Sequence, residues 1–190
     1  IATQTFNFGY VLQNQVLPEL LRRFRKHNLI HLYIETAVIF CYRWAIWLNP
    51  SLTEAHYRLG RLFQKQQKWS EAATAFEEST KIGDFKLADA YCNLGRVLLK
   101  LEQFEESIAA LEQAIKLEPE QYWYYRVLGR VWSEKGELAE AIKNYQIASQ
   151  KQISKTHPHV VLNTKGEQHL SAPNFIIIGQ AKCGTSSLYS

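Results

Sequence analysis

Apolar residues recur at helical spacing over most of the chain. In the segment LGRVLLKL (94–101) they fall three or four positions apart, so they share one face of a helix. Pro119 follows another such stretch and is typical of a position just past a helix end. Three polar interruptions separate successive apolar stripes: Lys68-Trp69, Gln103-Phe104 and Gly136-Glu137-Leu138. The pattern predicts an all-α chain built of helical hairpins.

One short motif returns at a nearly constant interval. Leu-Gly-Arg occupies 59–61, 94–96 and 128–130, at spacings of 35 and 34 residues. A small residue follows each glycine by 12 positions, a large one by 16 and another small one by 19. These residues are Ala72, Ser107 and Ala141; Phe76, Leu111 and Tyr145; and Ser79, Ala114 and Ala148. We interpret the glycine and small residues as points where two helices approach closely, with the large residues filling the gaps.

The repeat resembles the tetratricopeptide repeat (TPR), whose pattern has Leu-Gly, then Ala-x3-Phe, Ala and Pro at a 34-residue period. The resemblance covers three copies, at 53–87, 88–121 and 122–152. A degenerate N-terminal copy is expected at 1–52, with Leu12 to His27 as its first helix and Tyr42, Ala45, Leu48 and Pro50 matching its end. The implied fold is a solenoid of helical hairpins with a concave groove.

One apolar segment, Leu29 to Leu48, is about long enough to cross a bilayer. It carries His31, Glu35 and Arg43, each of which is costly at membrane depth. We therefore expect a buried amphipathic helix and no membrane span.

Composition adds modest constraints. The chain has 190 residues, of which 46% are hydrophobic, and a formal net charge of +4. The only dense basic run, Arg22 to Lys26, is interpreted as a solvated helix face, so no nucleic-acid partner is expected. Three cysteines at no metal-ligand spacing favour a reducing, cytoplasmic compartment and no metal site. The chain starts at Ile1 and lacks methionine, so the true N-terminus is expected to lie upstream.

Arg61, Arg96 and Arg130 occupy equivalent positions in the three copies. The resemblance to TPR proteins places that position in the groove. One hypothesis is that they receive an acidic protein or peptide, or an anionic acceptor such as a glycan. The other is that they are surface arginines paired with nearby carboxylates.

The C-terminal residues change character. Residues 153–172 read as a linker, because Pro158 and Gly166 interrupt the helical period. Then Phe175 to Ile178 form a β-branched run typical of a buried strand. A glycine-containing loop and a possible helix start follow, an arrangement suited to binding an anion. It is not a Walker A loop, because Thr185 and not lysine follows Gly184.

The segment 173–190 resembles the start of the sulfotransferase family, which uses 3′-phosphoadenosine 5′-phosphosulfate (PAPS) as co-substrate. The matching features are the strand PNFIIIG, followed by Lys182, Gly184, Thr185, Ser186, Ser187 and Leu188. The resemblance implies that Lys182 contacts the bridging oxygen and the sulfonate as the catalytic cation. It implies that Cys183 and residues 184–187 surround the 5′-phosphate. The family more often has Ser or Gly at Cys183 and Thr at Ser186.

Two functions are compatible with these patterns. The chain is expected to be the N-terminal fragment of a TPR-containing sulfotransferase, which transfers a sulfonate from PAPS to a hydroxyl or amine. On that reading 173–190 is a truncated start of an α/β domain, too short to be active alone. The alternative is a non-catalytic TPR scaffold for protein–protein interaction. A P-loop kinase is disfavoured by the missing Gly-Lys-Ser/Thr.

Overall fold

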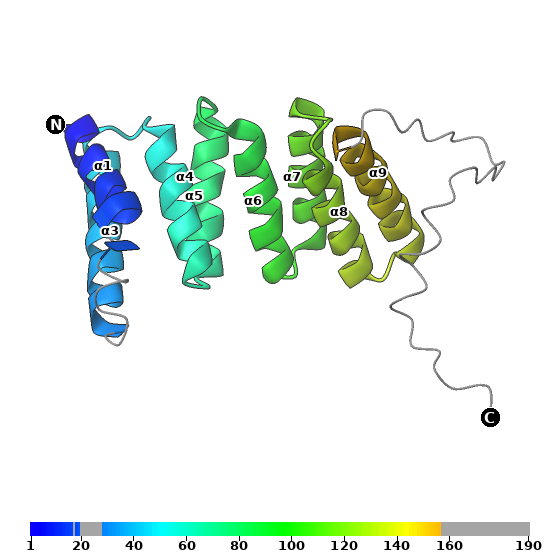
Figure 1. Ribbon diagram of the computed structural model, residues 1–190, viewed down its shortest axis with the longest axis horizontal. Coiled ribbons are helices and arrows are strands. Elements are labelled where there is room, and N and C mark those ends of the chain that lie inside the picture. Colours follow the sequence, from blue (N-terminus) through cyan, green and yellow to red (C-terminus); the bar gives the residue numbers. More distant parts are fainter. Residues whose placement is uncertain (17, 20–27, 157–190) are drawn as a thin grey trace.

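The computed structural model describes residues 1–16, 18–19 and 28–156, and within them every regular element is helical (Figure 1). The elements are α1 (Ala2–Val11), the π-helical turn η1 (Leu12–Val16), α3 (Asn28–Leu48), α4 (Thr53–Lys65), α5 (Trp69–Ile82), α6 (Leu87–Lys100), α7 (Phe104–Leu117), α8 (Tyr122–Lys135) and α9 (Leu138–Thr156). They stand in a row in chain order, from α1 and α3 at one end to α8 and α9 at the other. The all-α prediction is confirmed for this part of the chain.

Each hairpin closes around its glycine. In the α6–α7 hairpin, a Cβ atom on Gly95 would lie 2.7 Å from Cγ of Leu111 and 3.1 Å from the backbone oxygen of Ser107. The Ser107 hydroxyl donates a 2.6 Å hydrogen bond to the carbonyl oxygen of Gly95. Leu111 is fully buried. The spacings of 12 and 16 residues therefore mark a close helix–helix contact that any side chain at 95 would obstruct.

The leucines that precede the glycines are buried. Leu59, Leu94 and Leu128 are 6%, 7% and 6% exposed, and the helices that contain them, α4, α6 and α8, pack on the second helix of the preceding hairpin. Tyr124 of α8 is fully buried, and its hydroxyl donates a 3.0 Å hydrogen bond to Oδ1 of Asp89 on α6. Apolar burial thus continues from one repeat into the next, as in solenoids.

The turns inside the hairpins share a left-handed residue. Gln67, Glu102 and Gly136 follow the first helix of their hairpins, with φ of 59°, 61° and 96°. Only one of the three is glycine, the residue that adopts this conformation without steric cost. The other two hairpins carry strain at the same place.

In the N-terminal hairpin, the helix that packs on α3 is α1, which ends before Leu12. Much of the stretch from Leu12 to His27, which the sequence predicted as the first helix, lies outside the described residues. A Cβ on Gly9 would lie 3.1 Å from Cε1 of Tyr42, so this pair repeats the glycine–large residue contact of the other hairpins. Tyr42 and Ala45, two of the four residues expected to match the end of a repeat, are fully buried. Gly9 and Tyr42 are 33 residues apart (42 − 9), against 16 in the other copies, so the usual spacing does not mark this contact.

The end of the last repeat also differs from expectation. Helix α9 continues to Thr156, past the predicted boundary at 152. Nothing between 149 and 156 breaks a helix, and the first proline in this region is Pro158. Among the helices described, none is long and apolar enough to cross a membrane.

Candidate functional site: a basic groove

A groove of about 1180 Å³ runs along the first helices of the three repeats, α4, α6 and α8. Arg61, Arg96 and Arg130 all line it, so the structure brings the three predicted residues to one surface. Each arginine follows the glycine that faces the second helix, and one step along a helix turns the side chain by about 100°. The side chain therefore points away from the hairpin interior.

The lining of the groove is strongly basic. Its charged side chains are the cations of Arg61, Lys65, Arg96, Lys100, Arg126 and Arg130, and the single carboxylate of Asp89. The buried Tyr124 holds that carboxylate by the 3.0 Å hydrogen bond described above. Cations thus outnumber carboxylates on this surface.

The three predicted arginines differ in their contacts. Nε of Arg130 lies 2.7 Å from Oε1 of Glu134, with both side chains well exposed (58% and 40%). Nη1 of Arg96 donates a 3.4 Å hydrogen bond to Asn93. For Arg61, no ion pair with another described residue is found. The hypothesis of carboxylate pairing is therefore met at Arg130 alone among the three, and exposed pairs of that kind contribute about 0 to 1 kcal/mol.

Aromatic and amide groups lie between the cations. Tyr57, Trp69, Trp123 and Tyr145 line the groove, together with Asn93. Nδ2 of Asn93 lies 3.4 Å from the hydroxyl of Tyr57. Burial raises the pKa of Tyr57, and the nearby carboxylate of Asp89 raises it further. The phenol is therefore neutral and can serve as a hydrogen-bonding group at physiological pH.

The groove contains no activated nucleophile among the described residues. Cys92 lines it but is only 5% exposed. Burial raises the pKa of the Cys92 thiol to about 12, so it stays protonated at neutral pH. Cys92 is therefore not available as a thiolate nucleophile in the groove.

The predicted PAPS-binding residues Lys182, Cys183, Gly184, Thr185, Ser186 and Ser187 lie outside the described residues, as does the predicted strand. Their role stays a prediction.

Sequence reasoning missed three cations of the groove. Lys65 and Lys100 each stand five residues after a repeat glycine, a recurrence that would have revealed them. The third copy breaks it with Glu134. Arg126 aligns with Tyr57 and Cys92, so no repeat signal marked it.

The comparisons with known proteins agree with this architecture. Residues 88–121 and 54–81 each match a sequence model of the tetratricopeptide repeat. Among solved structures, the crystal structure of MamA is similar, with 21% identity and a TM-score of 0.61, covering 74% of this chain and 86% of that one. MamA from Desulfovibrio magneticus RS-1 has 23% identity and a TM-score of 0.61, covering 81% and 96%. YrrB, "a TPR protein with an unusual peptide-binding site", has 20% identity and a TM-score of 0.55, covering 72% and 75%. The search of curated proteins found no match.

The described part of the chain is therefore a helical-repeat protein. Residues 54–81 and 88–121 match the tetratricopeptide repeat in sequence, and the fold of the described part is similar to that of the solved structures named above.

Proposed function

We propose that the chain acts as a protein-interaction module whose basic groove binds an acidic segment of a partner protein. The observation that carries the proposal is the convergence of six cations and one carboxylate on the groove, with two of the cations, Lys65 and Arg130, ion-paired to Glu35 and Glu134, which do not line it. Arginine suits this task, because its planar guanidinium binds a carboxylate through two parallel hydrogen bonds. YrrB, whose title describes a peptide-binding site, is a precedent for peptide recognition on this fold.

The aromatic lining adds a second contribution. Trp123, which is partly buried, and Tyr145, which is 40% exposed, lie among the cations and offer apolar contact area to a bound segment. Neighbouring side chains already hold some rings in place: Nζ of Lys155 lies 5.8 Å from the Trp123 ring centroid. We therefore expect a ligand that alternates acidic with apolar residues to bind better than one that is acidic throughout.

The test uses Arg96→Glu combined with Arg130→Glu. A fluorescein-labelled peptide alternating Glu with Leu is titrated with the chain and followed by fluorescence anisotropy. The double variant should lose binding, because two attractive charges become repulsive. Its melting temperature should fall by no more than a few degrees, since both arginines are exposed. Binding by the unmodified chain should weaken as salt is raised.

The matched control is Lys116→Glu combined with Lys143→Glu. It changes the net charge equally, but neither lysine lines the groove. We expect it to bind the peptide as the unmodified chain does. Equal loss in both double variants would show attraction by net charge alone and contradict a groove site. No loss in the Arg96 and Arg130 variant would also contradict it.

We also propose that residues 173–190 begin a PAPS-dependent sulfotransferase domain. The support is the order of three features described above: a run typical of a strand, a glycine-containing loop, and Lys182 within that loop. The test is to read the coding sequence past codon 190 and, where it continues, to assay sulfonate transfer by the longer product. Lys182→Ala should abolish transfer, because the ammonium would stabilise charge on the leaving phosphate. Lys165→Ala, in the predicted linker, should not. A stop codon at 191 would refute the proposal.

A further inference from the structure

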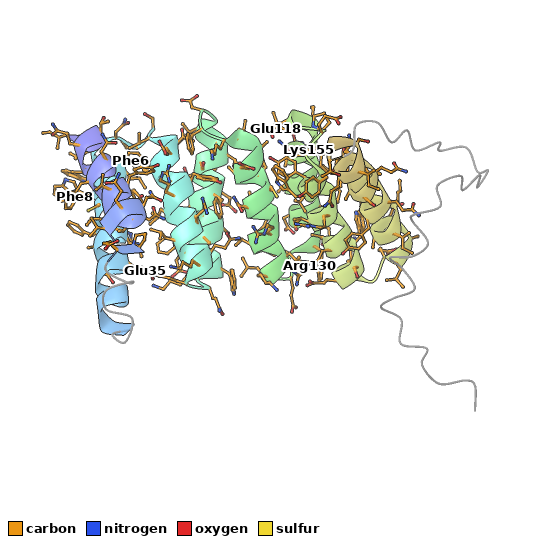
Figure 2. The ribbon with its side chains drawn as sticks, in the orientation of Figure 1. Phe6, Phe8, Glu35, Glu118, Arg130 and Lys155 are labelled. Carbon is orange, nitrogen blue, oxygen red and sulfur yellow. The ribbon has the colours of Figure 1, made fainter. Side chains whose placement is uncertain are left out.

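A cluster of large aromatic side chains lies exposed on the N-terminal hairpin. We call Phe8, Phe40, Trp44 and Trp47 the end patch; their side chains are 59%, 64%, 44% and 70% exposed. The rings of Phe40, Trp44 and Trp47 form a continuous row along α3. The ring centroids of Phe40 and Trp44 are 6.0 Å apart, and those of Trp44 and Trp47 are 5.1 Å apart. Figure 2 shows Phe8 at the outer edge of the stack, on α1.

The repeat register shows that Phe8 occupies a covered position. It directly precedes Gly9, as Leu59, Leu94 and Leu128 precede their glycines. Those three leucines are almost fully buried, whereas Phe8 is mostly exposed. A position that the fold normally covers is thus filled here by a larger apolar side chain.

The end-patch residues of α3 (Phe40, Trp44 and Trp47) differ from the other repeats in the opposite way, because they stand at solvent-facing positions. Since Tyr42 aligns with Phe76 and Leu111, the other repeats show which residues solvent-facing positions normally carry. Aligned with Phe40, Trp44 and Trp47 are Thr74, Glu78 and Lys81 in α5, and Ala109, Gln113 and Lys116 in α7. Three aromatics at these positions leave a contiguous exposed apolar surface, and surface of this kind marks interaction sites.

The chemistry of the end patch fits a protein partner. Residues 1–16 carry no charged side chain. One cation, the exposed Arg43, lies on the same side of α3, three residues after Phe40 and one before Trp44. Aromatic residues and arginine are enriched in the centres of protein interfaces, where lysine, glutamate and aspartate are depleted.

The end patch also contains both parts of a reciprocal contact. A hollow of about 260 Å³ is lined mostly by apolar groups, including those of Phe8, Phe40 and Trp44. Trp47 does not line this hollow and projects beside it. An apolar cavity of about 150 Å³ holds benzene, so this hollow has room for an indole ring. A projection and a matching hollow on one surface are what a two-fold symmetric interface requires, because each copy offers both.

We propose that the end patch is the interface of a symmetric homodimer, in which Trp47 of each copy enters the hollow of the other. The basic groove is lined by none of the four end-patch residues, so it stays accessible in the dimer. The dimer carries two grooves and binds a partner with repeated acidic segments more tightly than one copy does.

The test measures the mass of the chain by light scattering after size exclusion, from micromolar to sub-millimolar concentration. The unmodified chain should approach the dimer mass as concentration rises. Trp47→Glu should stay monomeric throughout, with an unchanged circular dichroism spectrum because the side chain is exposed. Phe40→Glu is a second variant with the same expected result, which decides the matter if Trp47→Glu fails to fold. The control is Ile142→Glu on α9, an equally drastic change at a 57% exposed apolar residue away from the end patch. It should dimerise normally.

Three results would overturn the proposal. The first is an unmodified chain that is monomeric throughout. The second is loss of the dimer in Ile142→Glu as well, which would indicate head-to-tail association of α1 with α9. The third is sedimentation of a monomeric chain with vesicles of phosphatidylcholine and phosphatidylserine, abolished by Trp47→Glu, which would assign the end patch to a membrane surface.

Discussion

Gly95→Ala tests whether the glycines hold the hairpins together by close approach. Gly95 lies in the middle of α6, where alanine is favoured over glycine by about 1 kcal/mol on helix propensity alone. Propensity therefore predicts a more stable protein. The contact with α7 predicts the opposite, so the sign of the change decides between the two effects.

The magnitude follows from two distances. Carbon atoms pack best at about 3.5 to 4.0 Å, so a Cβ at 2.7 Å from Cγ of Leu111 is roughly 1 Å too close. Leu111 is fully buried and has no space to move into, and the Ser107 backbone oxygen at 3.1 Å cannot rotate away. Overpacking of this kind costs about 1 to 3 kcal/mol. Taking the upper part of that range and subtracting the propensity gain leaves a net loss of about 1 to 2 kcal/mol.

The assay is urea unfolding followed by far-UV circular dichroism, with thermal melting as a second measure. A loss of this size should lower the melting temperature by roughly 3 to 6 °C in a chain of this length. Ala109→Gly is the calibration variant, because Ala109 is exposed in the middle of the facing helix α7 and reports propensity alone. A Gly95→Ala protein that is stabilised by as much as Ala109→Gly is destabilised would refute the close-approach explanation.

Two further predictions concern the turns and the buried ionisable groups. Glu102→Gly should stabilise the chain by about 0.5 to 1 kcal/mol in urea unfolding, because glycine relieves the left-handed strain at φ 61° and this gain exceeds the added entropy of the unfolded chain. Glu102→Ala is the control, and an equal gain from alanine would contradict the strain argument. Stability should also fall as pH rises above about 9. Burial raises the pKa of Cys92 from 9.0 to about 12, and it raises the pKa of Tyr42 and of Tyr124 above the usual value for tyrosine. The unfolded chain therefore loses these protons at a lower pH than the folded chain does. Each such group lowers the free energy of unfolding by about 1.4 kcal/mol per pH unit between its pKa in the unfolded chain and its pKa in the folded chain. Cys92→Ala should therefore give a shallower decline from pH 9 upward. An unchanged slope would contradict the role of that thiol.

The repeat sequence predicted the helical hairpins because the same contact is made several times. Gly60, Gly95 and Gly129 face Phe76, Leu111 and Tyr145 at a fixed interval, so a local rule recurs and becomes visible in one sequence. The rule failed in the N-terminal hairpin. There the Gly9–Tyr42 contact spans an insertion, and no fixed spacing marks it.

The basic groove was predicted in part. Arg61, Arg96 and Arg130 recur with the repeat, but Arg126 comes from a position where the other copies have tyrosine and cysteine. Its place among the cations depends on how α8 stacks beside α6, which sequence spacing does not record.

The sequence by itself determined the class of element, the number and register of the regular repeats, and which residues close each hairpin. These follow from contacts within about 20 residues, which local periodicity encodes. Tertiary structure alone decided which side chains the repeats gather into one groove, that α1 pairs with α3, and that Phe40, Trp44 and Trp47 of α3 face outward. Those properties depend on stacking between hairpins, where the exposure of Phe8 or Trp47 is set by neighbours distant in the chain and not by its own segment.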